Sequence, residues 1–96
     1  MRSVTETTAY GKIKHLYDFG NCMVKKLYIN ENKQIAPIGA APYTKVVYIV
    51  VQGRANVLYD QYSTFKGPGA LIELNYPTTI INKSKTRLIL LNIVIK

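Results

Sequence analysis

Two stretches of the sequence decide the fold: K-V-V-Y-I-V-V-Q-G-R-A-N-V at Lys45–Val57 and G-P-G-A-L-I-E-L-N-Y-P-T-T-I-I-N at Gly67–Asn82. Both join short runs of Val, Ile, Leu and Tyr through glycine, a pattern typical of β-strands connected by tight turns. Similar runs recur along the chain, without a sustained helical repeat. The expected strands are Lys12–Phe19, Cys22–Asn30, Lys45–Gln52, Arg54–Asp60, Ala70–Leu74, Thr78–Asn82 and Arg87–Lys96. This spacing predicts an all-β sandwich or small barrel.

The length and composition set the outer limits. The 96 residues, 48% of them hydrophobic, suit one core but not two, so we expect a single domain over residues 1–96 with residues 1–10 as an extended N-terminal arm. The sequence has neither the run of about 20 apolar residues that spans a membrane nor a secretory signal, so we expect neither membrane insertion nor classical secretion. With Cys22 as its single cysteine, the chain fits the cytoplasm or another reducing compartment, a virion included.

The charge of the chain is strongly positive. Thirteen Lys and Arg against five Asp and Glu give a net charge of +8, which attracts phosphates and nucleic acid. The cations are scattered singly or in pairs, as on an ordinary solvated surface. Tyrosines interleave with them at Lys25–Tyr28, Tyr43–Lys45 and Tyr59–Lys66, and such residues bind single strands when they share one exposed face. A basic nucleic-acid-binding β-barrel is therefore a minor alternative.

Two expected strands are apolar on both faces, Val46–Val51 and Leu88–Ile95. One face of each can fill a barrel interior, but the other needs a cover. We expect a second copy of the chain to supply it, in a homodimer or higher homo-oligomer. The alternative is that residues 1–20 fold over this face. The expected contact residues are Val47, Ile49, Val51, Ile89, Leu91 and Ile93.

Several segments match one known frame: Tyr10-Gly11, Val24–Ile29, Val47–Ala55, Gly69–Leu74, Pro77, Asn82 and Leu88–Val94. On these segments the chain, from about Gly11 to Lys96, resembles a single small cupin. It is most similar to the C-terminal cupin of type II mannose-6-phosphate isomerase/mannose-1-phosphate guanylyltransferase proteins. The resemblance implies a jelly roll of antiparallel strands, which in most cupins carries a metal site.

The first cupin motif, G-x5-H-x-H-x3/4-E-x6-G, has lost its ligands here. When its last glycine is set at Gly53, the glutamate position falls on Val46. The two histidine positions fall on Ala40 and Pro42, or on Gly39 and Ala41 in the alternative spacing. None of these residues binds a metal through its side chain.

The second motif, G-x5-P-x-G-x2-H-x3-N, keeps its full interval from Gly67 to Asn82. Its histidine position falls on Thr78, and its proline and inner glycine positions fall on Glu73 and Asn75. Pro68-Gly69 also matches the usual turn, which leaves the frame ambiguous by two residues, and neither frame places a histidine at the ligand position. A divalent metal needs three or four converging ligands, usually with imidazole among them. The sequence therefore predicts a cupin without metal or other cofactor.

Metal-free catalysis also lacks its residues. Acid–base chemistry in a barrel would pair a histidine with an acid or a tyrosine, and the one histidine, His15, lies in an early strand outside both motifs. The five acids fall mainly at turns and ends. Cys22 is expected to be a buried, unreactive thiol. We expect that the protein is not an enzyme.

The barrel interior offers one candidate pocket. If Val46 points inward, strand alternation turns Tyr48 inward with it, and Thr78 faces it from the opposite strand. The candidate ligand residues are Tyr43, Tyr48 and Thr78, whose hydroxyls suit a small neutral or sugar-like ligand. The same residues suit a filled core, which we favour over a ligand site.

The sequence as a whole predicts a non-catalytic, metal-free mini-cupin that serves as a homo-oligomeric structural or interaction module. Its partners are further copies of itself and other proteins of a larger assembly, such as a viral one. A sugar-binding or sugar-phosphate-binding cupin and the nucleic-acid-binding barrel are the alternatives.

Overall fold

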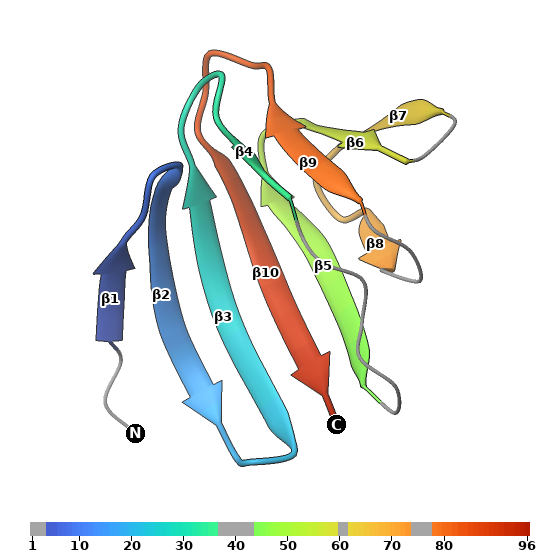
Figure 1. The fold of residues 1–96 in the computed structure, drawn as a ribbon. Coiled ribbons are helices and arrows are strands. Elements are labelled where there is room, and N and C mark those ends of the chain that lie inside the picture. The colour runs from blue at the N-terminus through green and yellow to red at the C-terminus, as the bar shows by residue number, and fades with distance from the viewer. Residues whose placement is uncertain (1–3, 37–43, 60–61, 74–77) are drawn as a thin grey trace.

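Ten antiparallel strands in two sheets make up the described part of the chain, which in this computed structural model covers residues 4–36, 44–59, 62–73 and 78–96 (Figure 1). The strands are β1 (Val4–Thr7), β2 (Gly11–Asp18), β3 (Cys22–Ile29), β4 (Gln34–Ile35), β5 (Lys45–Gln52), β6 (Ala55–Leu58), β7 (Ser63–Lys66), β8 (Leu71–Glu73), β9 (Thr79–Asn82) and β10 (Leu88–Ile95). Within these residues, no helix is long and apolar enough to cross a membrane.

The chain passes repeatedly between the two sheets. The large sheet has the order β1-β2-β3-β10-β5-β8 and the small sheet the order β4-β9-β6-β7. Connections such as β3 to β4, β5 to β6 and β9 to β10 change sheets, as in a jelly roll. The predicted all-β jelly roll is therefore confirmed. Each of the seven expected segments contains a strand, whereas β1, β4 and β7 were not expected.

The core lies between the sheets. The large sheet contributes the buried residues Leu27, Ile29, Tyr48, Val50, Ile72, Leu88 and Leu90. The small sheet contributes Ile35, Ala55, Val57 and Ile80. Alternate residues of each strand point into this layer, because successive side chains of a strand face opposite ways. The expected inward side of β5 and β9 is confirmed, with Tyr48, Val50 and Ile80 at most 8% exposed.

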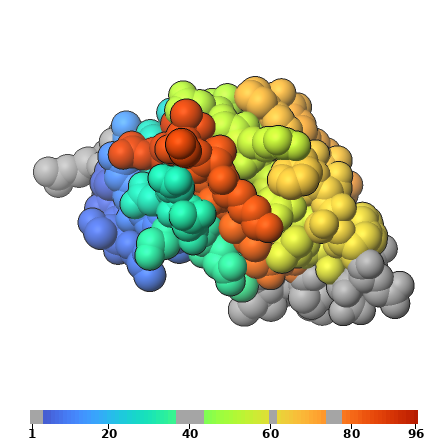
Figure 2. All heavy atoms as spheres, turned by 90° about the horizontal axis from the view of Figure 1, so that it is seen from above, coloured from blue at the N-terminus to red at the C-terminus, as the bar shows by residue number. Residues whose placement is uncertain are grey.

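Asn82, the residue that ends the second motif, fastens one end of the barrel. Its side-chain amide donates to the carbonyl oxygens of Ile29 at 2.8 Å and Thr86 at 2.9 Å. Its side-chain oxygen accepts from the backbone amide and the hydroxyl of Ser84. Backbone bonds from Asn32 to Asn82 and from Asn82 to Lys33 join the two loops that lie side by side in Figure 2. The motif's asparagine is kept here for structure.

Two glycines of the matched frame are also required by backbone packing. Gly53 has φ +90°, and a Cβ there would come within 2.9 Å of the Arg87 carbonyl oxygen. A Cβ on Gly11 would overlap the carbonyl oxygen of Tyr28. An L side chain strains the first position and collides at the second. These two glycines of the cupin-like pattern are thus explained by the backbone geometry of the barrel.

The N-terminal segment extends the large sheet sideways. β1 pairs with β2 from Val4 opposite His15 to Thr7 opposite Lys12, and β2 in turn pairs with β3. The described residues of this segment therefore lie in the sheet and do not cover its outer face. The alternative in which residues 1–20 fold over that face is wrong for Val4–Gly20.

Candidate functional site

The positions at which a cupin holds its metal carry side chains that do not fit one. Val46, at the glutamate position, is half-buried and packs against the core. Thr78, at the main histidine position of the second motif, is 3% exposed. Glu73 forms an ion pair with Lys45 at 3.2 Å on the opposite, outer face. Residues 39–42 and Asn75 lie outside the described residues. Neither Val46 nor Thr78 supplies a nitrogen or carboxylate ligand.

The remaining titratable candidates stand apart. His15 Nε2 lies 3.0 Å from Glu6 Oε1, joining β2 to the edge strand β1. In the part of the chain that the structure describes, His, Cys, Asp and Glu side chains nowhere gather in threes to form a possible metal site. Cys22 is half-buried at the start of β3, so the expectation of a buried thiol is wrong in degree.

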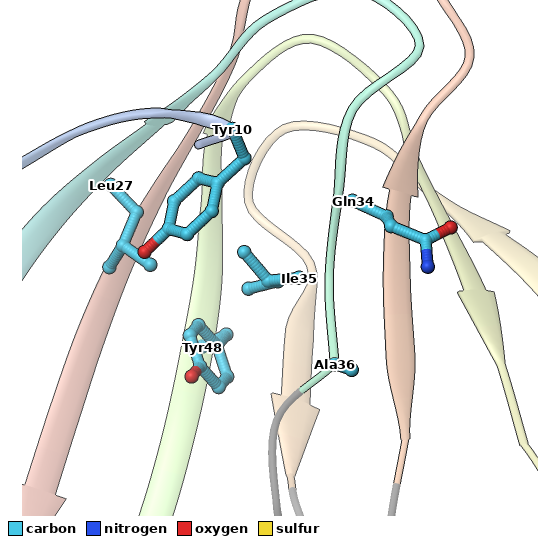
Figure 3. A pocket seen from close by; sticks show the side chains of 6 residues that line it. All are labelled: Tyr10, Leu27, Gln34, Ile35, Ala36 and Tyr48. Carbon is cyan, nitrogen blue, oxygen red and sulfur yellow. The ribbon is translucent and has the colours of Figure 1, made fainter. Parts of the chain in front are cut away.

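One pocket opens at the inner side of the large sheet, with a volume of about 330 Å³ (Figure 3). It is lined by Tyr10, Leu27, Gln34, Ile35, Ala36 and Tyr48. The ring of Tyr10 comes from the connection before β2 and that of Tyr48 from β5, and both lie beside the Ile35 side chain, whereas the Gln34 amide is turned away from them. The pocket therefore has apolar walls and two phenol groups.

Both phenol groups of the pocket are neutral at physiological pH. Burial raises the pKa of Tyr48 to about 12, and the neighbouring Tyr10 adds to the effect. Burial also raises the pKa of Tyr10, with a further rise from the Glu6 carboxylate and a reduction from its hydrogen bond with Thr8. The described lining residues include no charged side chain. The pocket can donate and accept hydrogen bonds, but it lacks an acid–base pair suited to neutral pH.

The structure places the three predicted pocket residues differently. Tyr48 lines the pocket, Tyr43 lies outside the described residues, and Thr78 is not among the described lining residues. Sequence reasoning missed Tyr10, Gln34 and Ile35. The signal that could have found Tyr10 is its place beside Gly11, where the chain turns into β2 close to the Tyr28 carbonyl. Gln34 and Ile35 form a strand of two residues, too short to show alternation.

The predicted contact residues share the outer face of the large sheet. Val47 pairs with Ile93 and Ile49 with Leu91 across β5 and β10, and paired residues point the same way. Val51 and Ile89 continue these two rows toward the other end of the strands. Leu71 of β8, opposite Ile49, extends the apolar surface to the sheet edge. We call Val47, Ile49, Val51, Leu71, Ile89, Leu91 and Ile93 the apolar strip.

Solved structures decide what this arrangement is similar to. The Cupin_2 domain of an XRE family transcriptional regulator from Enterobacter cloacae superposes with a TM-score of 0.75 at 11% identity, over 88% of this chain and 94% of that one. The chain has the cupin fold. The plu4264 protein of Photorhabdus luminescens matches with a TM-score of 0.80 at 12% identity, over 97% of this chain and 81% of that one.

A larger protein contains a unit of similar structure. The capsular polysaccharide assembling protein CapF of Staphylococcus aureus matches with a TM-score of 0.85 at 9% identity, over 99% of this chain but only 31% of that one. No protein-family model matches the sequence. No curated protein matches it either. The likeness therefore establishes the cupin fold, and the closer similarity to mannose-phosphate cupins stays a prediction.

Proposed function

We propose that this cupin-fold chain is a non-catalytic interaction module that associates with further copies of itself through the apolar strip. The observation that carries the proposal is that β10 and β5, two neighbouring inner strands of the large sheet, present apolar side chains on both faces, and that among the described residues the small sheet covers only one of these faces. An uncovered apolar face of this kind is typical of protein interfaces. The half-buried Cys22 at its margin fits a reducing compartment.

The packing of the apolar strip supports a second copy as its cover. Ile49 and Leu91 lie opposite each other at the centre, and Leu71 and Val51, which are 54% and 46% exposed, lie at the margin. A two-fold axis would bring the same patch of both copies together. The N-terminal strands, which were the competing cover, lie in the sheet instead.

The size of the apolar strip sets the strength that we expect. The apolar strip lies on β10 and β5, which have eight residues each, and on β8, which has three. Strands of eight residues are about 27 Å long and lie about 4.8 Å apart, so these three strands project roughly 300 Å² per copy. A specific interface typically buries about 800 Å² per partner. The apolar strip alone is thus smaller than a typical specific interface, so association should be weak and should depend on concentration. Larger assemblies would need additional contacts.

The test replaces Ile49 by lysine and measures mass by light scattering over a concentration series. We expect a dimer or higher oligomer for the unchanged protein and a monomer for Ile49→Lys, because a lysine at the centre of the contact loses its hydration. Phe65→Lys is the matched control, since Phe65 is an apolar strand residue, 51% exposed, on the small sheet. A monomeric mass for the unchanged protein and both variants would overturn the proposal.

The pocket favours a second candidate function, the binding of a small neutral ligand with hydroxyl groups, such as a sugar. Tyr10 and Tyr48 can hydrogen-bond such a ligand beside the apolar walls of Leu27 and Ile35. Because the described lining carries no cation, a neutral sugar fits better than a sugar phosphate. A sugar that binds should raise the melting temperature in chelator-containing buffer, and Tyr48→Phe should reduce this shift. No shift with any sugar tested would reject this candidate.

A further inference from the structure

Cations and aromatic rings share the outer face of β2 and β3, beside the apolar strip. Lys12 pairs with Tyr28, Lys14 with Lys26, and Tyr17 with Val24, whose other neighbour Ile93 belongs to the apolar strip. Since cross-strand partners point to the same side, these residues all face outward. We call Lys12, Lys14, Tyr17, Lys26, Tyr28 and Arg87 the basic strip.

Three cations of the basic strip converge on one ring. Lys12 Nζ lies 4.8 Å and Lys26 Nζ 5.5 Å from the centre of the Tyr28 ring. The guanidinium of Arg87, the residue before β10, lies 5.7 Å from the same centre. Cation–π attraction holds the three positive groups around Tyr28. A concentrated positive charge results at this end of the sheet face.

No carboxylate balances this charge in the described residues. The ion pairs found there are His15 with Glu6 and Lys45 with Glu73, and neither involves the basic strip. Lys14 and Lys26 stand directly opposite each other across the β2–β3 ladder. Like charges in this position destabilise a sheet, and an anion bound between them would remove the repulsion.

Exposed rings continue the basic strip at its other end. Tyr17 is 41% exposed and Phe19 is 63% exposed, and their rings are 4.0 Å apart between centres at an angle of 84°. Exposed aromatic rings beside a row of cations are the arrangement on which bases of a single strand stack while its phosphates meet Lys and Arg. The common facing that the sequence leaves open for Lys25–Tyr28 is thus established for Lys26 and Tyr28.

We propose that the basic strip binds single-stranded nucleic acid. Lys12, Lys14, Lys26 and Arg87 hold the phosphates, and Tyr17 with Phe19 stacks on bases. Outward side chains recur about every 6.8 Å along a strand and about 4.8 Å between strands, close enough for neighbouring cations to meet consecutive phosphates. The basic strip lies mainly on β2 and β3, toward the sheet edge at β1, so a contact centred on β10 and β5 leaves room for the nucleic acid.

The test measures the fluorescence anisotropy of a labelled oligothymidylate of about 15 nucleotides between about 50 and 200 mM NaCl. Four phosphate contacts predict a slope of log affinity against log salt of roughly −3, and Lys14→Gln with Lys26→Gln should make it shallower by about 1.4. The control variant, Lys66→Gln with Lys83→Gln, removes the same charge from β7 and from the loop between β9 and β10. It should leave the slope unchanged.

A second variant tests the rings. Tyr17→Ala with Phe19→Ala should weaken oligothymidylate binding at least about five-fold, since each stacked base contributes that much or more. Thermal melting checks that all variants are folded. The proposal is overturned by an absence of oligonucleotide binding at about 50 mM NaCl, by equal slopes in the two lysine pairs, or by an unchanged affinity in the ring variant. Retention on vesicles of anionic lipid without oligonucleotide binding would instead assign the basic strip to a membrane surface.

Discussion

The two faces of the six-stranded sheet carry the same kinds of apolar side chain, but the described residues cover only one of them. Leu90 lies under the small sheet with 0% exposure, and its cross-strand partners Leu27 and Val50 are at most 5% exposed. Leu91, the next residue, lies half-buried on the outer face. Chemistry alone therefore does not distinguish the two positions. Among the described residues, the barrel buries only one of these faces, and the other is the one for which we propose association.

Truncating one leucine on each face tests this comparison most strongly. Leu90→Ala leaves a cavity in the core and should lower the free energy of unfolding by about 2 to 5 kcal/mol. Leu91→Ala should cost less than half of that in dilute protein, because its partners are solvent and strand neighbours. Urea unfolding at low concentration, where association does not add to stability, gives both values. Equal losses would mean that the outer face is already covered within one chain.

Two buried asparagines differ in how many hydrogen bonds their side chains make, and this difference predicts how much each contributes to stability. Asn82 makes four side-chain hydrogen bonds, so Asn82→Ala should lower the free energy of unfolding by about 2 to 3 kcal/mol. Asn92 donates one longer bond, 3.4 Å, to the Val47 carbonyl, and Asn92→Ala should cost less than about 1.5 kcal/mol. If Asn82→Ala melts like the unchanged protein, the motif's asparagine is not kept for structure.

The buried phenol of Tyr48 makes the stability of the covered face depend on pH. Its pKa rises from 10.0 to about 12 on folding, so the stabilisation from burying the neutral hydroxyl is present below pH 10 and is lost as the pH rises toward 12. The loss amounts to about 2 to 3 kcal/mol. Urea unfolding at a series of pH values measures this loss as a change in the difference between the free energies of unfolding of the unchanged protein and Tyr48→Phe. A difference that does not change above pH 10 would contradict the burial of this hydroxyl.

The sequence predicts those strands whose own residues show a clear pattern and misses those that depend on pairing with other strands. The long strands β3, β5 and β10 carry their own alternation or apolar runs, so they and the facing of Tyr48 and Leu91 could be predicted. β1 and β7 pair with their chain neighbours β2 and β6 but have four residues each, too few to show a clear alternation. β4 has two residues and exists through pairing with a distant strand, as Gln34 does with Ile81. Local patterns do not contain such pairings.

The candidate sites divide in the same way. Val46 and Thr78 could be recognised as non-ligands because motif spacing alone places them. The pocket residues Tyr10 and Ile35 could not be found, because a loop and a two-residue strand bring them to β5 only in the folded chain. The convergence of Lys12 and Arg87 on Tyr28 likewise depends on the neighbours of β3 in the sheet. The site residues that the sequence did not predict are thus mostly those whose neighbours are set by the order of strands in the sheet.

The mass of the unchanged protein in solution tests the central claim most directly. Sedimentation equilibrium over a concentration series should show a monomer of 96 residues giving way to a dimer or higher oligomer as concentration rises, because the uncovered apolar strip associates with its own copy. A monomeric mass at every concentration would contradict the account.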